Sequence, residues 1–82
     1  MRVLMLAILF LPAASLGDKQ IFESTQIKAK QGDVLSQYNL GVMYADGEGV
    51  SKDQKEAVKW YRLAADQGYA DAQYKLGVKY NY

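Results

Sequence analysis

Residues 37–44 read QYNLGVMY, and residues 73–80 read QYKLGVKY. The two octapeptides belong to a longer repeat, because a shift of 36 residues places segment 27–46 on segment 63–82 with nine of 20 positions identical. The identical pairs include glycines and tyrosines as well as commoner residues. A period of this length is typical of solenoids built from helix pairs.

Each period contains segments that read as helices. Segment 53–67 has no Gly or Pro, and Asp53 is placed to cap its start, with Glu56 three residues later. Gly68 follows as a residue that can end the helix. The apolar residues fall at the spacing of one buried stripe, at Ala57, Val58, Trp60, Tyr61, Ala64 and Ala65. We call this helix type B.

A second helix type, A, is predicted from about residue 33 to 45 and again from about 70 to 80. Segment 19–31 ends in the same Ala-x-Gln-Gly pattern as segment 53–67, so it is interpreted as a degenerate B helix. The sequence therefore predicts an all-α fold of about four helices in the order B-A-B-A. The predicted core stripe of the A helices is Tyr38, Leu40, Gly41 and Tyr44, with Tyr74, Leu76, Gly77 and Tyr80 in the copy. The tyrosines and Trp60 are interpreted as contacts between helices rather than as a ligand-stacking surface.

Two glycines lie inside the predicted A helices. Each costs roughly 1 kcal/mol relative to Ala in a helix interior. Gly41 and Gly77 occupy the same place in the two copies, beside the apolar stripe. We expect a neighbouring helix to approach closely at both positions.

The loop 46–52 is rich in glycine and acids. A calcium loop of the EF-hand type beginning at Asp46 would need Gly at its sixth position, where Ser51 stands. A phosphate-binding loop would need a different glycine spacing. Gly47 and Gly49 are therefore predicted to reverse the backbone between two helices, with positive φ at one or both.

The N-terminus has the pattern of a signal peptide. Arg2 precedes the apolar run 3–11, and Pro12 and small residues follow it. Spanning a bilayer takes about 20 apolar residues, more than this run supplies. A buried helix that is apolar on every side would need a larger protein around it. We predict a signal peptide over 1–17, cleavage after Gly17 with Ala14 or Ser15 as alternatives, and a secreted or periplasmic mature chain 18–82.

Composition argues against catalysis and against nucleic acid. The chain has ten basic and nine acidic residues, so removal of Arg2 with the signal peptide leaves nine of each and a formal charge of zero. Such a balance gives no electrostatic footprint for nucleic acid or for an anionic membrane. The sequence has no His and no Cys, the commonest general base and zinc ligands. We predict no enzyme activity, no catalytic residue, no cofactor and no metal.

The repeat resembles the Sel1-like repeat family, a relative of the tetratricopeptide repeats. The family pattern appears at Leu40, Gly41, Tyr44, Gly47, Gly49, Val50, Asp53, Ala57, Trp60, Tyr61, Ala64, Ala65 and Gly68, and it restarts at Ala70, Ala72, Gln73, Leu76 and Gly77. The chain departs from it at Ser36, where Ala is usual, and over 21–27, which lacks the Trp-Tyr core. The resemblance divides the mature chain into a degenerate helix B at 18–31, one full repeat at 32–67 and the first helix of another at 68–82.

The resemblance implies a right-handed stack of antiparallel helix pairs whose concave face binds a protein or peptide. The chain would then be an adaptor or scaffold, and the alternative is a secreted effector or enzyme inhibitor that blocks a target protein. Surface positions that differ between the copies are the candidates for partner contact: Asn39, Met43, Lys75 and Lys79. The last helix has no successor to cover part of its apolar surface, so we expect self-association, docking to a partner or loose packing of that helix, unless the chain is a truncated piece of a longer array.

Overall fold

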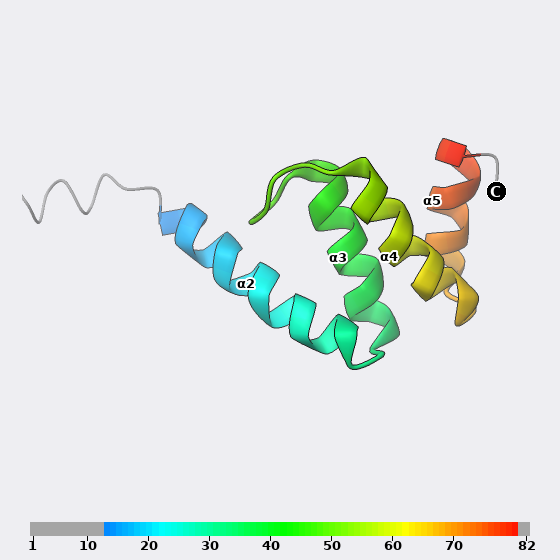
Figure 1. Cartoon of the computed structure of the whole chain (residues 1–82), viewed down its shortest axis with the longest axis horizontal. Coiled ribbons are helices and arrows are strands. Elements are labelled where there is room, and N and C mark those ends of the chain that lie inside the picture. The colour runs from blue at the N-terminus through cyan, green and yellow to red at the C-terminus, as the bar shows by residue number, and fades with distance from the viewer. Residues whose placement is uncertain (1–12, 81–82) are drawn as a thin grey trace, which may run out of the picture.

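The computed structural model describes residues 13–80, and within that range all regular secondary structure is helical (Figure 1). The helices are α2 (Ala13–Lys30), α3 (Val34–Asp46), α4 (Gln54–Asp66) and α5 (Ala70–Tyr80). Successive helices alternate in direction and each packs on the next, which makes a short solenoid. The all-α prediction is confirmed, and α3, α4 and α5 begin and end within a residue of the predicted bounds.

α2 is longer than predicted, because it begins at Ala13 rather than near residue 19. The predicted cleavage point after Gly17 therefore lies inside a helix. Residues 1–12, most of the predicted signal peptide, lie outside the described residues. Between residues 13 and 80, no helix combines the length and the apolar content needed to cross a membrane.

Aspartates begin the two central helices. The Asp53 side chain accepts hydrogen bonds from the backbone N–H groups of Lys55 (3.0 Å) and Glu56 (3.1 Å), as predicted for an N-cap. Asp33 caps α3 in the same way, accepting from the hydroxyl and the backbone N–H of Ser36. These two bonds hold the pKa of Asp33 below its ordinary value, because they favour the ionised carboxylate.

The loop between α3 and α4 is a turn that glycine makes possible. Gly47 and Gly49 have φ of 74° and 71°, which confirms the predicted left-handed conformations. The backbone N–H groups of Gly47 and Glu48 both donate to the Met43 carbonyl, at 2.8 and 2.9 Å. At its far end the Asp53 N–H donates to the Tyr44 carbonyl (2.9 Å), so the loop is tied to α3 at both ends.

The core is built largely from alanines and aromatic rings. One cluster gathers seven buried residues around α4, with Ala57, Ala64, Ala72 and Leu76 fully inaccessible to solvent. A second cluster joins Ala29, Leu40 and Trp60.

Aromatic rings pack between the helices, as the core interpretation predicts. Tyr38 packs on the rings of Tyr61 and Tyr69, with centroids 5.7 and 5.0 Å away, and Phe22 meets Tyr44 edge to face. The interpretation is wrong for Tyr74, whose side chain is 70% exposed because no described helix covers that side of α5.

α3 and α4 approach each other closely at Gly41. A Cβ built on Gly41 would lie 2.6 Å from two carbons of the Tyr61 ring and 3.2 Å from the Ala57 carbonyl oxygen. Tyr61 is 1% exposed and has little room to move. The expected close approach is thus confirmed at Gly41. At Gly77 it is wrong, because a Cβ there would meet no described heavy atom within 4 Å.

Alanine at the two glycines should therefore have opposite effects on stability. Gly41→Ala forces the buried Tyr61 ring to shift and should lower the free energy of unfolding by about 1–3 kcal/mol, the usual cost of overpacking. Gly77→Ala removes only the helix penalty of glycine and should raise it by up to about 1 kcal/mol. Urea denaturation followed by circular dichroism measures both, and equal effects of the two substitutions would contradict this explanation.

Candidate functional site

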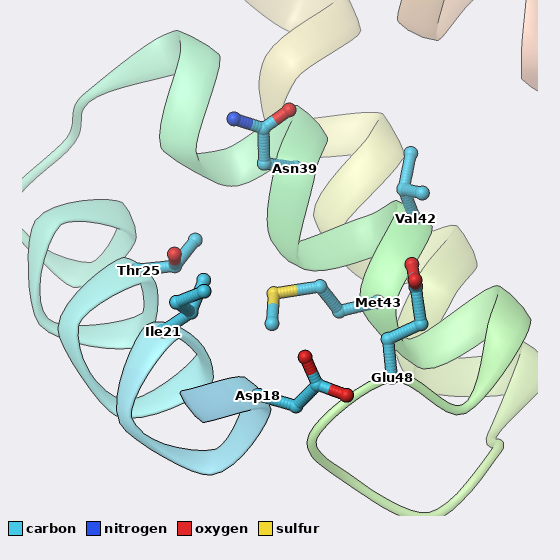
Figure 2. Close-up of a pocket in the computed structure, with 7 residues that line it drawn as sticks. All are labelled: Asp18, Ile21, Thr25, Asn39, Val42, Met43 and Glu48. Atoms are coloured by element: carbon cyan, nitrogen blue, oxygen red, sulfur yellow. The ribbon is translucent and has the colours of Figure 1, made fainter. Parts of the chain in front are cut away.

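A pocket of about 290 Å³ opens between α2 and α3 (Figure 2). It is lined by Asp18, Ile21, Thr25, Asn39, Val42, Met43 and Glu48. We call this site the α2–α3 groove. Figure 2 shows the Met43 side chain reaching from α3 toward Ile21, with the Asp18 carboxylate on the α2 side of the groove and the Glu48 carboxylate on the α3 side. In Figure 1 the N-terminal half of α2 stands away from α3.

The groove combines apolar side chains with uncompensated negative charge. Ile21 is 58% exposed, whereas Met43 is 8% exposed and fills the space between the helices. Asp18 and Glu48 form no ion pair with any described side chain. The surface is suited to an apolar side chain of a partner with a basic group beside it.

The loop after α3 closes one end of the groove. Gly49 lies so close to the start of α2 that a Cβ there would overlap the Asp18 carbonyl oxygen. Glu48, next to it, is thereby held at the edge of the groove. The glycine that allows the turn also allows the loop to reach α2.

The other end is fixed by a buried glutamine. Gln37 is 5% exposed, and its side-chain Nε2 donates to the Ala29 carbonyl near the end of α2 (3.2 Å). Its Oε1 accepts from Nε2 of Gln67 (2.7 Å), which also donates to the Gly32 carbonyl (3.3 Å). Gln37 therefore connects the end of α2, α3 and the residue after α4.

The same bond recurs one repeat later. Gln73 Nε2 donates to the Ala65 carbonyl at 3.2 Å, the distance found between Gln37 and Ala29. All four residues belong to the nine identical pairs of the repeat. The sequence shows that these residues are identical in the two copies, but the hydrogen bonds that they form were not predicted from it.

The structure brings two of the four predicted partner-binding residues into the groove. Asn39 is exposed and lines it, and Met43 lines it while being mostly buried between helices. Lys75 is half-buried on α5 and is not part of the groove. The side chain of Lys79 lies outside the described residues.

Sequence reasoning missed the α2 side of the groove, although the repeat carries a signal for it. The three α2 residues of the groove are Asp18, Ile21 and Thr25, and 36 residues later stand Gln54, Ala57 and Tyr61. In the full repeat those three residues hold α3. Gln54 Nε2 donates to the Ala45 carbonyl (3.1 Å), and Tyr61 and Ala57 lie against Gly41. The groove is therefore the counterpart of the place that α3 fills beside α4.

No described residues form a group of three or more acids, His or Cys that could hold a metal ion. The pKa of Tyr38 is raised, chiefly by burial and secondarily by the charge of Asp71. That of Tyr44 is raised by burial and, less, by the charges of Glu56 and Asp53. Both shifts follow from the packing of phenols in the core.

Comparison with known proteins finds a family whose model matches this chain. A model described as the Sel1 repeat matches residues 34–69 and again 70–82. The chain is 51% identical over 53 residues (65% of its length) to a putative sel1-like repeat-containing protein, L21, of Acanthamoeba polyphaga mimivirus, covering 10% of that protein. It is 33% identical over 76 residues (93% of its length) to DAP3-binding cell death enhancer 1 of Rattus norvegicus, covering 15% of it.

A solved structure shows the same arrangement. The crystal structure of a Sel1 repeat protein from Oxalobacter formigenes superposes with a TM-score of 0.68 at 46% identity, over 70% of this chain and 23% of that one. The chain thus spans less than a quarter of each of these relatives.

The bridging role of Gln37 predicts an asymmetry between the two glutamines. Gln37→Leu removes two hydrogen bonds from a nearly buried side chain, and one such bond typically contributes about 0.5–1.5 kcal/mol to stability. Gln73→Leu removes a single described hydrogen bond at an exposed position, so its effect on the free energy of unfolding should be clearly smaller. Urea titrations of both variants give the comparison, and an equal or larger loss for Gln73→Leu would contradict the bridging role.

Proposed function

Because the chain belongs to the Sel1 repeat family, we propose that it is an exported, non-enzymatic interaction module that binds a segment of a partner protein in the α2–α3 groove. The rat relative is by its name a DAP3-binding protein, so binding of another protein has a precedent among the relatives. The concave binding face that the family resemblance implies is assigned here to the groove. Its partner is a protein or peptide rather than nucleic acid.

One observation carries this assignment: the groove repeats the surface that holds α3 elsewhere in the chain. Asp18, Ile21 and Thr25 occupy the register of Gln54, Ala57 and Tyr61, and those residues pack on a helix. A partner segment in the groove would accordingly be helical, with an apolar face toward Ile21 and Met43. The Asp18 and Glu48 carboxylates favour a basic side chain at its end.

The size of the site agrees with a macromolecular partner. A volume of about 290 Å³ lies at the lower limit of pockets that bury drug-sized ligands, about 300 Å³. One or two side chains of a helix fit such a space while the rest of the helix contacts the rims. This is the helix-in-groove mode of recognition.

Site-specific photocrosslinking tests the groove. A photoreactive amino acid at Asn39 should form adducts with a discrete partner protein in the native host. The same amino acid at Arg62, exposed on α4 and outside the groove, serves as the control. Charge reversal by Asp18→Lys with Glu48→Lys should reduce the Asn39 adduct. Identical adducts from both positions, or no adduct from Asn39, would refute the proposal.

Export is tested separately by the N-terminus of the mature protein. Expression of the whole chain should yield a product that begins at Asp18 outside the cytoplasm, because the basic start, apolar run and small residues would be read by the export machinery. Edman sequencing or intact mass identifies the first residue. Recovery in the cytoplasm of a chain that still begins at residue 1 would contradict export. A variant that lacks residues 2–17 is the control.

A further inference from the structure

α5 presents an open face that α3 does not. Tyr74 and Val78 are 70% and 65% exposed, and nothing described lies within 4 Å of a Cβ on Gly77. One repeat earlier, Tyr38 and Val42 are partly buried against the α4 cluster. α5 therefore carries the residues of the α3 surface, and no helix between residues 13 and 80 covers them.

The hydrogen bonds show the same difference. Gln37 donates to the preceding helix and accepts from Gln67, so both ends of its amide are used. Gln73 donates to the Ala65 carbonyl in the same way, but no described group donates to its Oε1. The acceptor that completes the contact in the full repeat is free on α5.

α2 presents the complementary half of that interface. α3 is covered by Gln54, Ala57 and Tyr61 of α4 and by Gln67, which follows α4. The residues 36 positions earlier are Asp18, Ile21, Thr25 and Gln31, of which the first three line the α2–α3 groove. Ile21 is 58% exposed, and Gln31 is also exposed.

We propose that a second copy of this chain fills the groove, with the α5 helix of one copy lying in the α2–α3 groove of the next. The packing would follow that of α3 on α4, with Gly77 against Thr25 and with Gln31 Nε2 donating to Gln73 Oε1. This inference rests on the proposed function, since it names the occupant of the same groove. The two surfaces are different and lie on different helices, so the interface is heterologous and can extend beyond a dimer.

The substitutions between α2 and α4 set the strength of this contact. Thr25 replaces Tyr61, and Ser24 replaces Trp60, so α2 offers less apolar surface than α4 does. The larger Ile21 in place of Ala57 restores part of it. The association is therefore weaker than the packing within one chain, and it is reversible and concentration-dependent.

Two single substitutions test the two surfaces of the proposed interface one at a time. Ile21→Arg blocks the groove and Gly77→Arg blocks the open face of α5. Both positions are solvent-exposed, so both variants should keep the helical circular dichroism spectrum. Ile27→Arg is the matched control, because Ile27 is 59% exposed on the same helix but outside the groove.

Sedimentation equilibrium of the 82-residue chain gives the readout. The unsubstituted chain and the Ile27→Arg control should rise above the 9.2 kDa mass of one chain as concentration increases. Each blocked variant alone should show a many-fold weaker association. An equimolar mixture of the two should form a dimer of twice that mass and no larger species, since one intact groove and one intact α5 face remain between them.

Several results would overturn the inference. They are a chain that stays at 9.2 kDa at every concentration, a mixture no heavier than its separate components, or association that neither substitution weakens. In the last case the contact lies elsewhere. Adducts of Asn39 with a different protein, without self-association, would overturn this inference and leave the proposed function standing. Adducts of Asn39 with the chain itself alone would support it and would refute a foreign partner.

Discussion

The contact of Gly41 with the Tyr61 ring is the constraint on which the rest of the structure depends. Because position 41 has no side chain, the buried phenol lies against the α3 backbone and the two helices come close together. That distance lets Tyr38 reach both Tyr61 and Tyr69, and it places Gln67 within hydrogen-bonding range of Gln37. The small core can then be filled by alanines, which suits a chain with no disulfide to stabilise it.

The sequence repeat explains both the buried contacts between helices and the surfaces that are exposed on α2 and α5. Within the full repeat, Gly41 meets the Tyr61 ring and Gln37 bonds to Gln67, so residues of the repeat pattern contact one another in the interior. At α2 and at α5 the same pattern faces outward among the described residues. In the proposed assembly, the groove and the open face of α5 are the two halves of one interface.

The helices could be predicted from the sequence because local signals determine them. Asp53 and the glycines after the helices set the boundaries, and the 36-residue identity set the order of helix types. The close contact at Gly41 could also be predicted, since a glycine inside a helix requires a packing reason. The same argument was wrong at Gly77, because periodicity shows which residue types recur and not whether a neighbour is present. Only the α3 side of the groove could be predicted from the sequence, because Asn39 and Met43 differ between the copies. On the other side, Asp18, Ile21 and Thr25 line the groove because of the angle of the degenerate helix α2, and no local sequence pattern sets that angle.

The Gln37 amide has a further consequence. A primary amide has one nitrogen end and one oxygen end, and here the nitrogen faces the helix before it in the chain while the oxygen faces the residue after the next helix. A unit added in the reverse sense would set nitrogen against nitrogen or oxygen against oxygen at a nearly buried position. The glutamines therefore give the stack a chemical polarity, so that units can be added in one sense only and each end is recognisable as a beginning or an end.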